Sequence, residues 1–459
     1  MTLLADEVTA ADAPLPAMAP RPARALSKPR LIRAILTNPI AACDRELFEE
    51  PIVARRFFGR PVFVVSEPEG VRRVLLDNVG NYPRMPHFKR ALEAGLKSGL
   101  FTSDAETWQR HRRLMNPALD PRAIGADMPA LVAMMDDTLA AVGAAGREGP
   151  IDLAHFLVQW IARGNAHICT DDVEAVLPTI FGMAKFPGPP HPIDFIALPR
   201  TLRAWLRRRR VGNEAERHYP ALARLIAERR APDYAGRRDL IWRLANAGAG
   251  ESGGGLSDAE VRDEILTLGV GSIYTVLRPL TWLFYLLALH PEAEARLHAE
   301  LDGTIGRRVP SFAEIQKLVY LRNALFETMR LYPSIPVMMR TASAPDMICG
   351  RRIPRWSIVI VAPWIVHRHR TLWTEPDRFD PDRFAPEAVS ARPRFAYLPF
   401  SFGPRVCIGA SLAAMQMQIA AAMLAQRFRL RLAPGQAIEP ASWITVRPKN
   451  GIKFTVEPR

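Results

Sequence analysis

The longest helical pattern of hydrophobic positions in the chain covers residues 258–290. Ser257 and Glu260 stand three residues apart at its start, which is typical of a capping box, and Pro291 ends it. At a rise of about 1.5 Å per residue, such a helix is roughly 50 Å long and crosses a whole globular domain. We therefore expect it to be the central helix of a large core.

Shorter patterns on either side add further helices and a few extended segments. We expect helices over residues 107–119 (ended by Pro117), 311–332 (in two pieces) and 410–428. Extended segments are expected over residues 60–70, 351–364 and 444–458, the last as a hairpin around Asn450 and Gly451.

Composition places the chain among globular proteins. Hydrophobic residues make up 48% and charged residues 24% of its 459 residues, and no internal repeat divides it. The sequence therefore predicts a single large domain over residues 31–459, mainly α with small β-sheets. Residues 1–30 are rich in Pro and Ala, and we expect them to form a disordered tail.

Charge and cysteine content limit the partners and the cellular compartment that we expect for the chain. The formal net charge is +14 and the isoelectric point about 10.1, which favours an acidic protein partner over nucleic acid because no nucleic-acid-binding motif accompanies it. The longest apolar stretch, Thr281–Leu289, is too short to cross a bilayer, and the four cysteines lack CxxC spacing. We expect a cytoplasmic protein without integral membrane association. Contact of the basic segment 195–210 with an anionic membrane surface is the less favoured interpretation.

One cysteine, Cys407, lies in a turn with distinctive chemistry. The stretch FSFGPRVCIGA, residues 400–410, places it between Gly403 and Gly409 and just before an expected helix. Backbone N–H groups at a helix N-terminus favour a thiolate, and the glycines allow the tight backbone that directs them at the sulfur. Arg405 offers a cation to an acidic group, and Phe400 shields the site from water. A single thiolate without neighbouring His or Cys does not suit zinc, but it suits an axial position on haem iron.

The spacing Phe400-x-x-Gly403-x-Arg405-x-Cys407-x-Gly409 resembles the haem-binding signature of the cytochrome P-450 superfamily. The resemblance extends over roughly residues 50–457. It implies the triangular-prism-like helical fold of that family, a haem b cofactor (iron protoporphyrin IX) and Cys407 as the metal ligand. It also implies a monooxygenase that inserts one oxygen atom from O₂ into a lipophilic organic substrate.

Two further stretches resemble a structural lock of the same family. FETMR contains Glu327 and Arg330, one turn apart on a helix, and PDRF contains Arg383. The resemblance implies that these three residues join and hold the segment beneath the cysteine turn.

Other matching residues concern the cofactor. WQRHR contains Trp108 and Arg112, and MMRTA contains Arg340. The resemblance implies that they hold the haem propionates, for which arginine provides charge-assisted donors in a rigid fork. Phe400, Arg405 and Gly409 are assigned to cofactor binding on the same grounds.

The centre of the long helix departs from the family pattern. Where the family usually reads Ala/Gly-Gly-x-Asp/Glu-Thr-Thr/Ser, this chain has Gly271, Ser272, Ile273, Tyr274 and Thr275. The resemblance implies catalytic roles for Thr275, Tyr274 and Gly271. A tyrosine is ordinarily protonated at neutral pH, so it is a poor proton relay in place of an acid, although it still donates a hydrogen bond.

Pro279 is a second irregularity in this helix. It has no N–H to donate to the carbonyl of Thr275, four residues earlier. We therefore expect the helix to be perturbed at this point.

Three interpretations of the chemistry stay open. In the first, an ordinary monooxygenase takes its protons through water, Ser272 or the substrate. In the second, peroxide is the natural oxidant or the reaction is non-hydroxylating, because Tyr274 replaces the acid. In the third, the chain is a haem protein that only binds or senses a ligand. The retained Thr275 favours the first.

The positions that match the family also indicate a substrate pocket. The resemblance implies a substrate pocket lined by Met85, Phe88, Val270, Val337 and Met338. Trp356 replaces a glycine that the family usually has in a surface turn.

The chain ends about 50 residues past Cys407, so we expect no fused flavin or iron–sulfur domain and a separate ferredoxin-type electron donor with its reductase. Arg110, Arg112 and Arg113, on the helix that the family uses at its electron-receiving face, would steer such an acidic partner. We expect a monomer.

Overall fold

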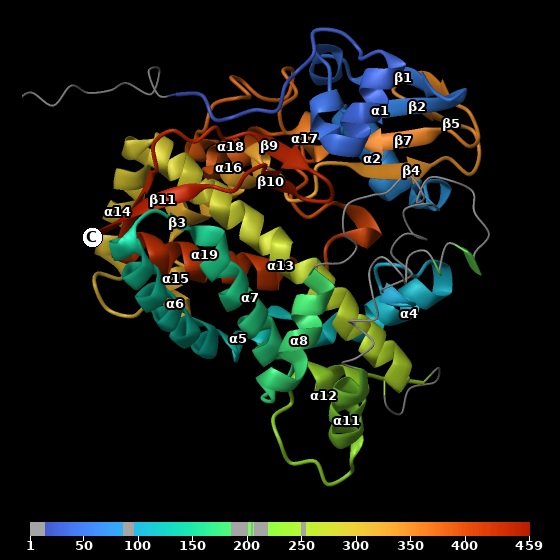
Figure 1. Ribbon diagram of the computed structural model, residues 1–459. Helices are drawn as coiled ribbons and strands as arrows, with labels where there is room; N and C mark the ends of the chain where they lie inside the picture. Colours follow the sequence, from blue (N-terminus) through green and yellow to red (C-terminus); the bar gives the residue numbers. More distant parts are fainter. Residues whose placement is uncertain (1–13, 86–95, 185–200, 203–204, 206–218, 249–253) are drawn as a thin grey trace, which may run out of the picture.

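The computed structural model describes residues 14–85, 96–184, 201–202, 205, 219–248 and 254–459. Helices account for most of these residues (Figure 1). The helices are α1 (Lys28–Thr37), α2 (Pro68–Arg72), α4 (Ala105–Met115), α5 (Pro121–Gly125), α6 (Met128–Glu148), α7 (Leu153–Cys169), α8 (Val173–Ala184), α11 (Tyr219–Arg230), α12 (Leu240–Ala245), α13 (Asp258–Leu289), α14 (Pro291–Thr304), α15 (Phe312–Ile315), α16 (Val319–Leu331), α17 (Pro363–Val366), α18 (Pro386–Ala391) and α19 (Ala410–Arg427).

In the part of the chain that the structure describes, the strands form one larger and three smaller sheets. The larger sheet has the order β1 (Ile52–Phe57), β2 (Arg60–Val65), β7 (Ile358–Val361), β4 (Met338–Thr341), with β2 and β7 parallel and the other pairs antiparallel. The smaller sheets are β3 (Ile151–Asp152), β11 (Lys453–Pro458) and β8 (Phe428–Leu432); β9 (Pro440–Ser442) and β10 (Val446–Pro448); and β5 (Asp346–Ile348) and β6 (Arg351–Ile353). The larger sheet lies at one end of the molecule and the helices fill the rest (Figure 1).

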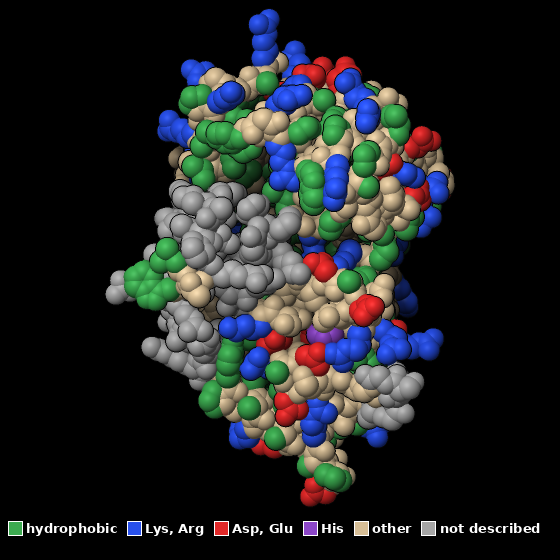
Figure 2. All heavy atoms as spheres, turned by 90° about the vertical axis from the view of Figure 1, so that its right-hand side faces the viewer, with side chains coloured by type: hydrophobic (Ala, Val, Ile, Leu, Met, Phe, Trp, Pro, Cys, Tyr) green, Lys and Arg blue, Asp and Glu red, His purple; other side chains and the backbone are tan. Residues whose placement is uncertain are grey.

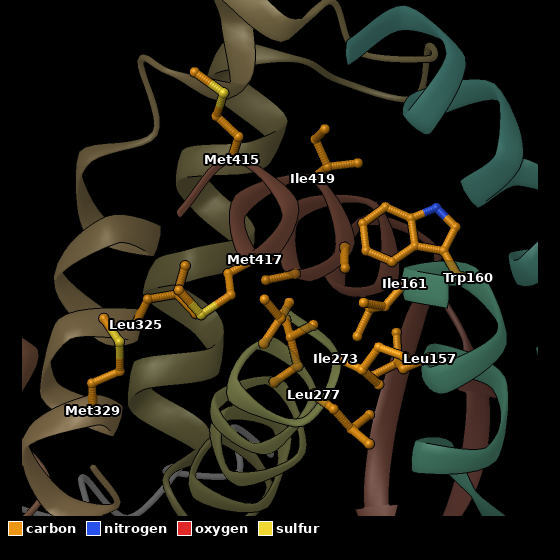
Figure 3. Packing of buried hydrophobic residues seen from close by; sticks show 14 of the residues in the cluster. Leu157, Trp160, Ile161, Ile273, Leu277, Leu325, Met329, Met415, Met417 and Ile419 are labelled. Atoms are coloured by element: carbon orange, nitrogen blue, oxygen red, sulfur yellow. The ribbon is translucent and has the colours of Figure 1, made fainter. Parts of the chain in front are cut away.

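The long helix α13 is the centre of the core, as the sequence predicts. Ser257 and Glu260 form both hydrogen bonds of a capping box at its start. Figure 3 shows Ile273 and Leu277 of α13 in one cluster with Leu157 of α7 and Met417 of α19, and all four are at most 2% exposed. The predicted mainly α fold with small β-sheets is confirmed.

Within the described residues, two helices have the length and hydropathy of membrane spans. They are α6 and α13, with mean hydropathy 1.3 over the most apolar window of each. In α13, 67% of that window is buried inside the protein, so the core accounts for its apolar composition. The test is therefore weak evidence for a membrane span.

The predicted terminal hairpin over residues 444–458 is wrong. Strand β10 pairs with β9, with Val446 opposite Ser442, whereas β11 pairs with β8 and β3. Gly451 does turn the chain, with φ of 75°, but it connects strands of different sheets. The local alternation identified two strands, and their partners come from elsewhere in the chain.

Part of the amino-terminal tail packs against the domain. The N–H of Ala17 donates to the hydroxyl of Tyr285 (2.8 Å), and the hydroxyl of Tyr332 donates to the carbonyl of Ala17 (2.7 Å). Arg21 forms an ion pair with Asp377 (3.0 Å). The expectation of disorder therefore fails for residues 14–30, while residues 1–13 lie outside the described residues.

Candidate active site

Cys407 stands at the end of a tight turn that leads into α19. The N–H of Cys407 donates to the carbonyl of Phe400 (3.0 Å), and the N–H of Val406 donates to the carbonyl of Gly403 (3.0 Å). Burial raises the pKa of the thiol, while the N–H of Gly409 and the guanidinium of Arg112 act in the opposite direction. The side chain nevertheless remains accessible. An accessible thiol with these donors is suited to bind a metal as its thiolate.

The other cysteines are less suited to this role. Cys43 and Cys169 are buried, and burial raises the pKa of each thiol to about 12. Cys349 is exposed, but it follows β5 at the sheet end of the molecule. No group of three or more His, Cys, Asp or Glu side chains within the described part of the chain could hold a metal ion.

Gly403 shows why the turn requires glycine. Its φ is 75°, and a Cβ atom at this position would lie 1.9 Å from the carbonyl oxygen of Leu75. The turn is therefore pressed against residues 73–77, and only a residue without a side chain fits.

Arginine side chains converge beside the cysteine turn. Arg112 donates to the carbonyl of Val406 (2.7 Å), next to Cys407. Arg405 lies over the ring of Trp108 (4.1 Å to the centroid) and donates to Asp104 (2.8 Å). Of the residues that the sequence assigned to the cofactor, the structure brings Trp108, Arg112, Arg405 and Cys407 into one region.

Arg340 and Arg84 complete this cluster. Arg84 pairs with the same carboxylate oxygen of Asp104 as Arg405 does (3.0 Å). Arg340 has no ion pair among the described residues, and burial together with the charge of Arg84 lowers its pKa to about 10. A half-buried guanidinium that forms no ion pair is stabilised when an anion joins it.

These residues fit the haem that the resemblance implies. The thiol turn offers one soft anionic ligand, and the arginine cluster has more cations than acids. A porphyrin iron with two propionates supplies the complementary groups.

The centre of α13 stays helical through Pro279. The Thr275 hydroxyl donates to the carbonyl of Gly271, four residues earlier, and Gly271 itself is exposed. The Thr275 carbonyl, which Pro279 leaves without its helical donor, accepts a hydrogen bond from the hydroxyl of Ser334 (2.9 Å). The expected perturbation is therefore a substituted hydrogen bond rather than a break.

The side chains of Tyr274 and Ser272 interact with residues other than Thr275 and Gly271. The guanidinium of Arg278 lies 4.9 Å from the ring centroid of Tyr274, within cation–π range, and burial lowers the pKa of Arg278 to about 10. The hydroxyl of Ser272 accepts from Asn165 (2.8 Å), which accepts from Gln416 (2.9 Å). Amides hold a hydroxyl in place but do not titrate, so this network is a poor proton route.

The predicted lock residues lie together. Arg330 donates to both carboxylate oxygens of Glu327 (2.7 Å each), and both side chains are fully buried. The Nε of Arg383 lies 3.5 Å from Glu327. Arg330 also donates to the carbonyls of Pro376 and Arg378, so it fixes the segment that precedes the cysteine turn.

The pocket predicted from Met85, Phe88, Val270, Val337 and Met338 stays a prediction. Val270 and Val337 pack against the main core, whereas Met338 packs against the cluster under the larger sheet. Met85 is half-buried, and Phe88 lies outside the described residues.

The predicted partner helix α4 is only partly available. Arg110 is engaged with Glu260 and with the carbonyl of Gly255 (3.1 Å), so it serves the domain itself rather than an outer face. Arg113 is exposed. The face that carries α4 and the larger sheet shows many Lys and Arg side chains with acidic ones among them (Figure 2).

Sequence reasoning missed several polar residues around the site. Asp104, Arg84 and Ser334 lie in segments without a distinctive pattern. Only Ser334 had a signal, because Pro279 indicated that the carbonyl of Thr275 would need another donor. On α4, the buried His111 lies between Glu264 (2.6 Å) and Glu260 (3.2 Å) of α13, which nothing in the spacing indicated.

Comparison with known proteins agrees with the fold. The model of the family described as Cytochrome P450 matches residues 32–162 and 186–456. The chain therefore belongs to the cytochrome P450 family. A crystal structure of the cytochrome P450DA heme domain superposes with a TM-score of 0.80 at 22% identity, covering 97% of this chain and 99% of that one.

Curated relatives cover most of the chain. Cyclooctatin synthase of Streptomyces melanosporofaciens is 32% identical and covers 89% of each chain. Putative cytochrome P450 132 of Mycobacterium tuberculosis is 30% identical over 94% of this chain and 96% of its own. Pentalenene oxygenase of Streptomyces avermitilis is 28% identical over 86% and 87%. The chain is accordingly an oxidoreductase that incorporates oxygen.

Proposed function

We propose that the chain is a haem b monooxygenase that inserts one oxygen atom from O₂ into a lipophilic organic substrate. The observation that carries the proposal is the accessible Cys407 thiol together with the cluster of Arg84, Arg340 and Arg405, in which Asp104 is the only carboxylate that forms an ion pair among the described residues. When bound, haem supplies the iron centre at which dioxygen is reduced and cleaved.

The side chains then have separate tasks. Cys407 would hold the iron as a thiolate, a form that the N–H of Gly409 favours. Arg405, Arg340 and Arg112 would bind the propionates, and the ring of Trp108 supports Arg405. Phe400 and Gly409 border the cofactor at the turn.

Thr275 and Gly271 on α13 are the residues that would handle protons for the reaction. The Thr275 hydroxyl holds a proton near the accessible backbone of Gly271 and passes it on from water. Tyr274 and Ser272 are engaged with Arg278 and Asn165. Water or the substrate therefore supplies the protons in this proposal.

Peroxide-dependent or non-hydroxylating chemistry is the second candidate. The observation that favours it is Tyr274, which stands in the position of the family's acid and is held by the cation of Arg278. A chain that only binds or senses a haem ligand is the third candidate. The ion pair of Glu327 and Arg330 does not distinguish this candidate from the two enzymes.

The substrate is proposed from the relatives and the apolar pocket positions. Two relatives carry names that specify oxidation of pentalenene and of cyclooctat-9-en-7-ol, both unsaturated carbon compounds. Val270, Val337, Met338, Met85 and Phe88 are proposed to line a pocket for a molecule of this lipophilic kind.

A separate acidic ferredoxin with its reductase is the proposed electron source. The net charge of +14 favours an acidic partner, and Arg113 with Arg112 on α4 lies on the side of the cysteine turn. We further propose a cytoplasmic monomer.

Carbon monoxide tests the axial ligand. Reduced holoprotein under carbon monoxide should show the red-shifted absorption band of thiolate-bound haem. Cys407→Ala should abolish that band, and Cys349→Ala, which changes an exposed thiol elsewhere, should leave it intact. A wild-type protein without the band contradicts the proposal.

The oxidant is tested with a panel of terpene hydrocarbons and alcohols that includes pentalenene. Product with NADH, ferredoxin, reductase and O₂ supports the monooxygenase. Product only with hydrogen peroxide supports the second candidate, and spectral binding without product under either condition supports the third.

A further inference from the structure

Pro279 creates a defined gap in the hydrogen bonds of α13. The carbonyl of Thr275 lacks the N–H that residue 279 would donate, and the neighbouring side chains of Val276, Leu277 and Leu280 are buried. Water has little access to such a carbonyl, so it needs a donor from the protein.

The donor comes from the loop between α16 and β4. The hydroxyl of Ser334, a residue only 8% exposed, donates to the carbonyl of Thr275 (2.9 Å). Tyr332, two residues before Ser334, stacks on Trp282 of α13 with ring centroids 3.9 Å apart and an interplanar angle of 8°. The loop is therefore held on α13 at two points.

Strand β10 links the Ser334 loop back to α13 by two further hydrogen bonds. The N–H of Val446 donates to the carbonyl of Ser334 (3.3 Å), and the carbonyl of Val446 accepts from the indole N–H of Trp282 (3.2 Å). Thr275, Ser334, Val446 and Trp282 thus form a closed path that begins and ends on α13. Ser334 has little freedom to leave its acceptor.

We propose that Ser334 is a positioning residue for Thr275. It replaces the hydrogen bond that Pro279 removes, and it thereby fixes the backbone that carries the Thr275 hydroxyl and its contact with Gly271. The inference rests on the proposed function, because the position of Thr275 matters there through proton delivery. It adds that a loop outside α13 sets that position.

A double-substitution cycle tests the pairing of Ser334 with Pro279. Ser334→Ala removes the donor, and Pro279→Ala restores a backbone N–H for the same carbonyl. Ser334→Ala alone should raise the unfolding equilibrium constant at a fixed urea concentration by roughly fivefold or more. In the Pro279→Ala background the same change should have a much smaller effect.

A spectroscopic signature separates positioning from stability alone. In reduced holoprotein with carbon monoxide, the infrared stretching band of the bound CO reports the polarity around Thr275. Ser334→Ala should shift or split this band, and Ser334→Thr, which keeps the hydroxyl, should retain it. Ser442→Ala is the control, because Ser442 is fully buried and its hydroxyl has no partner among the described residues.

Two results would overturn the inference. One is a Ser334→Ala protein whose unfolding and CO band match those of Ser442→Ala. The other is an equal effect of Ser334→Ala in the wild-type chain and in the Pro279→Ala background. If Pro279→Ala does not fold, the comparison of Ser334→Ala with Ser334→Thr decides. A wild type that binds no CO refutes the proposed function instead, and the unfolding cycle still decides the hydrogen-bond pairing.

Discussion

Replacing Gly403 by alanine should disrupt the cysteine turn through a single contact. The φ of 75° lies in the left-handed region, which costs an L-residue with a Cβ about 1–2 kcal/mol. The new Cβ would also lie 1.9 Å from the carbonyl oxygen of Leu75, so backbone must move, and overpacking of this kind costs about 1–3 kcal/mol. We expect Gly403→Ala to lower the free energy of unfolding by about 2–5 kcal/mol.

Gly435 provides a matched control for the backbone term. Its φ is 74°, and a Cβ at this position would meet no atom within 4 Å. Gly435→Ala should therefore cost only the left-handed penalty of about 1–2 kcal/mol. Urea unfolding gives the free energy of unfolding of both variants, and the comparison holds if both have the same dependence on urea concentration. The difference between the two losses is then the cost of the contact with Leu75. The carbon monoxide band per mole of protein reports how much of each variant still holds haem by a thiolate.

Equal losses for the two variants, within about 0.5 kcal/mol, would refute the reasoning about Leu75. That result would mean that the backbone of residues 73–77 yields without cost. A destabilised Gly403→Ala protein with a full carbon monoxide band would show instead that the turn tolerates the displacement and still presents Cys407 correctly.

Three further changes test other parts of the site. Glu327→Ala leaves the buried Arg330 without its carboxylate and should lower the free energy of unfolding in urea by about 3–5 kcal/mol. Asp382→Ala, which removes an exposed ion pair, should lower it by at most about 1 kcal/mol. Equal losses of stability in the two variants would contradict the burial argument. Burial lowers the pKa of His111, but hydrogen bonds and charge from two glutamates together raise it by more, so the net direction is upward. Its contribution to stability should therefore be complete below about pH 6.5 and be lost as the pH rises through the folded-state pKa, and His111→Gln should flatten this part of the profile of urea midpoint against pH. Tyr274→Asp should raise the yield of product per NADH consumed, with Tyr274→Phe as the control that removes only the hydroxyl; an unchanged yield in Tyr274→Asp would count against the account of the proton path.

The sequence predicted those features whose cause is local. The capping box of Ser257 and Glu260 and the end of α13 before Pro291 depend on neighbouring residues, and the structure has both. The mainly helical fold followed from periodicity. The turn at Cys407 was identified because its residues must stand in a fixed order within a few positions, and the structure gives it the expected tight backbone.

Features that depend on distant segments were missed or misread. Pro279 indicated that the Thr275 carbonyl would lose its donor, but Ser334 lies 59 residues away and no local pattern pointed to it. Strand β11 looked like half of a hairpin, although its partners β8 and β3 come from other parts of the chain. Arg110 looked like a surface charge, because its partner Glu260 belongs to a different helix. Tertiary packing decides each of these cases.

The arginine cluster explains why folding of this region and cofactor binding should be coupled. Arg84 and Arg405 share one carboxylate, Asp104, and Arg340 forms no ion pair among the described residues. These three guanidinium groups, with Arg112 as a fourth at the cysteine turn, outnumber the one carboxylate, and the two propionates of the proposed haem would supply two negative charges. In the chain alone, burial lowers the pKa of Arg340 and of Arg405 to about 10, a sign that their charged forms are held at a cost. A ligand with two carboxylates removes that cost, so its binding should stabilise the folded chain beyond what the Cys407 bond supplies.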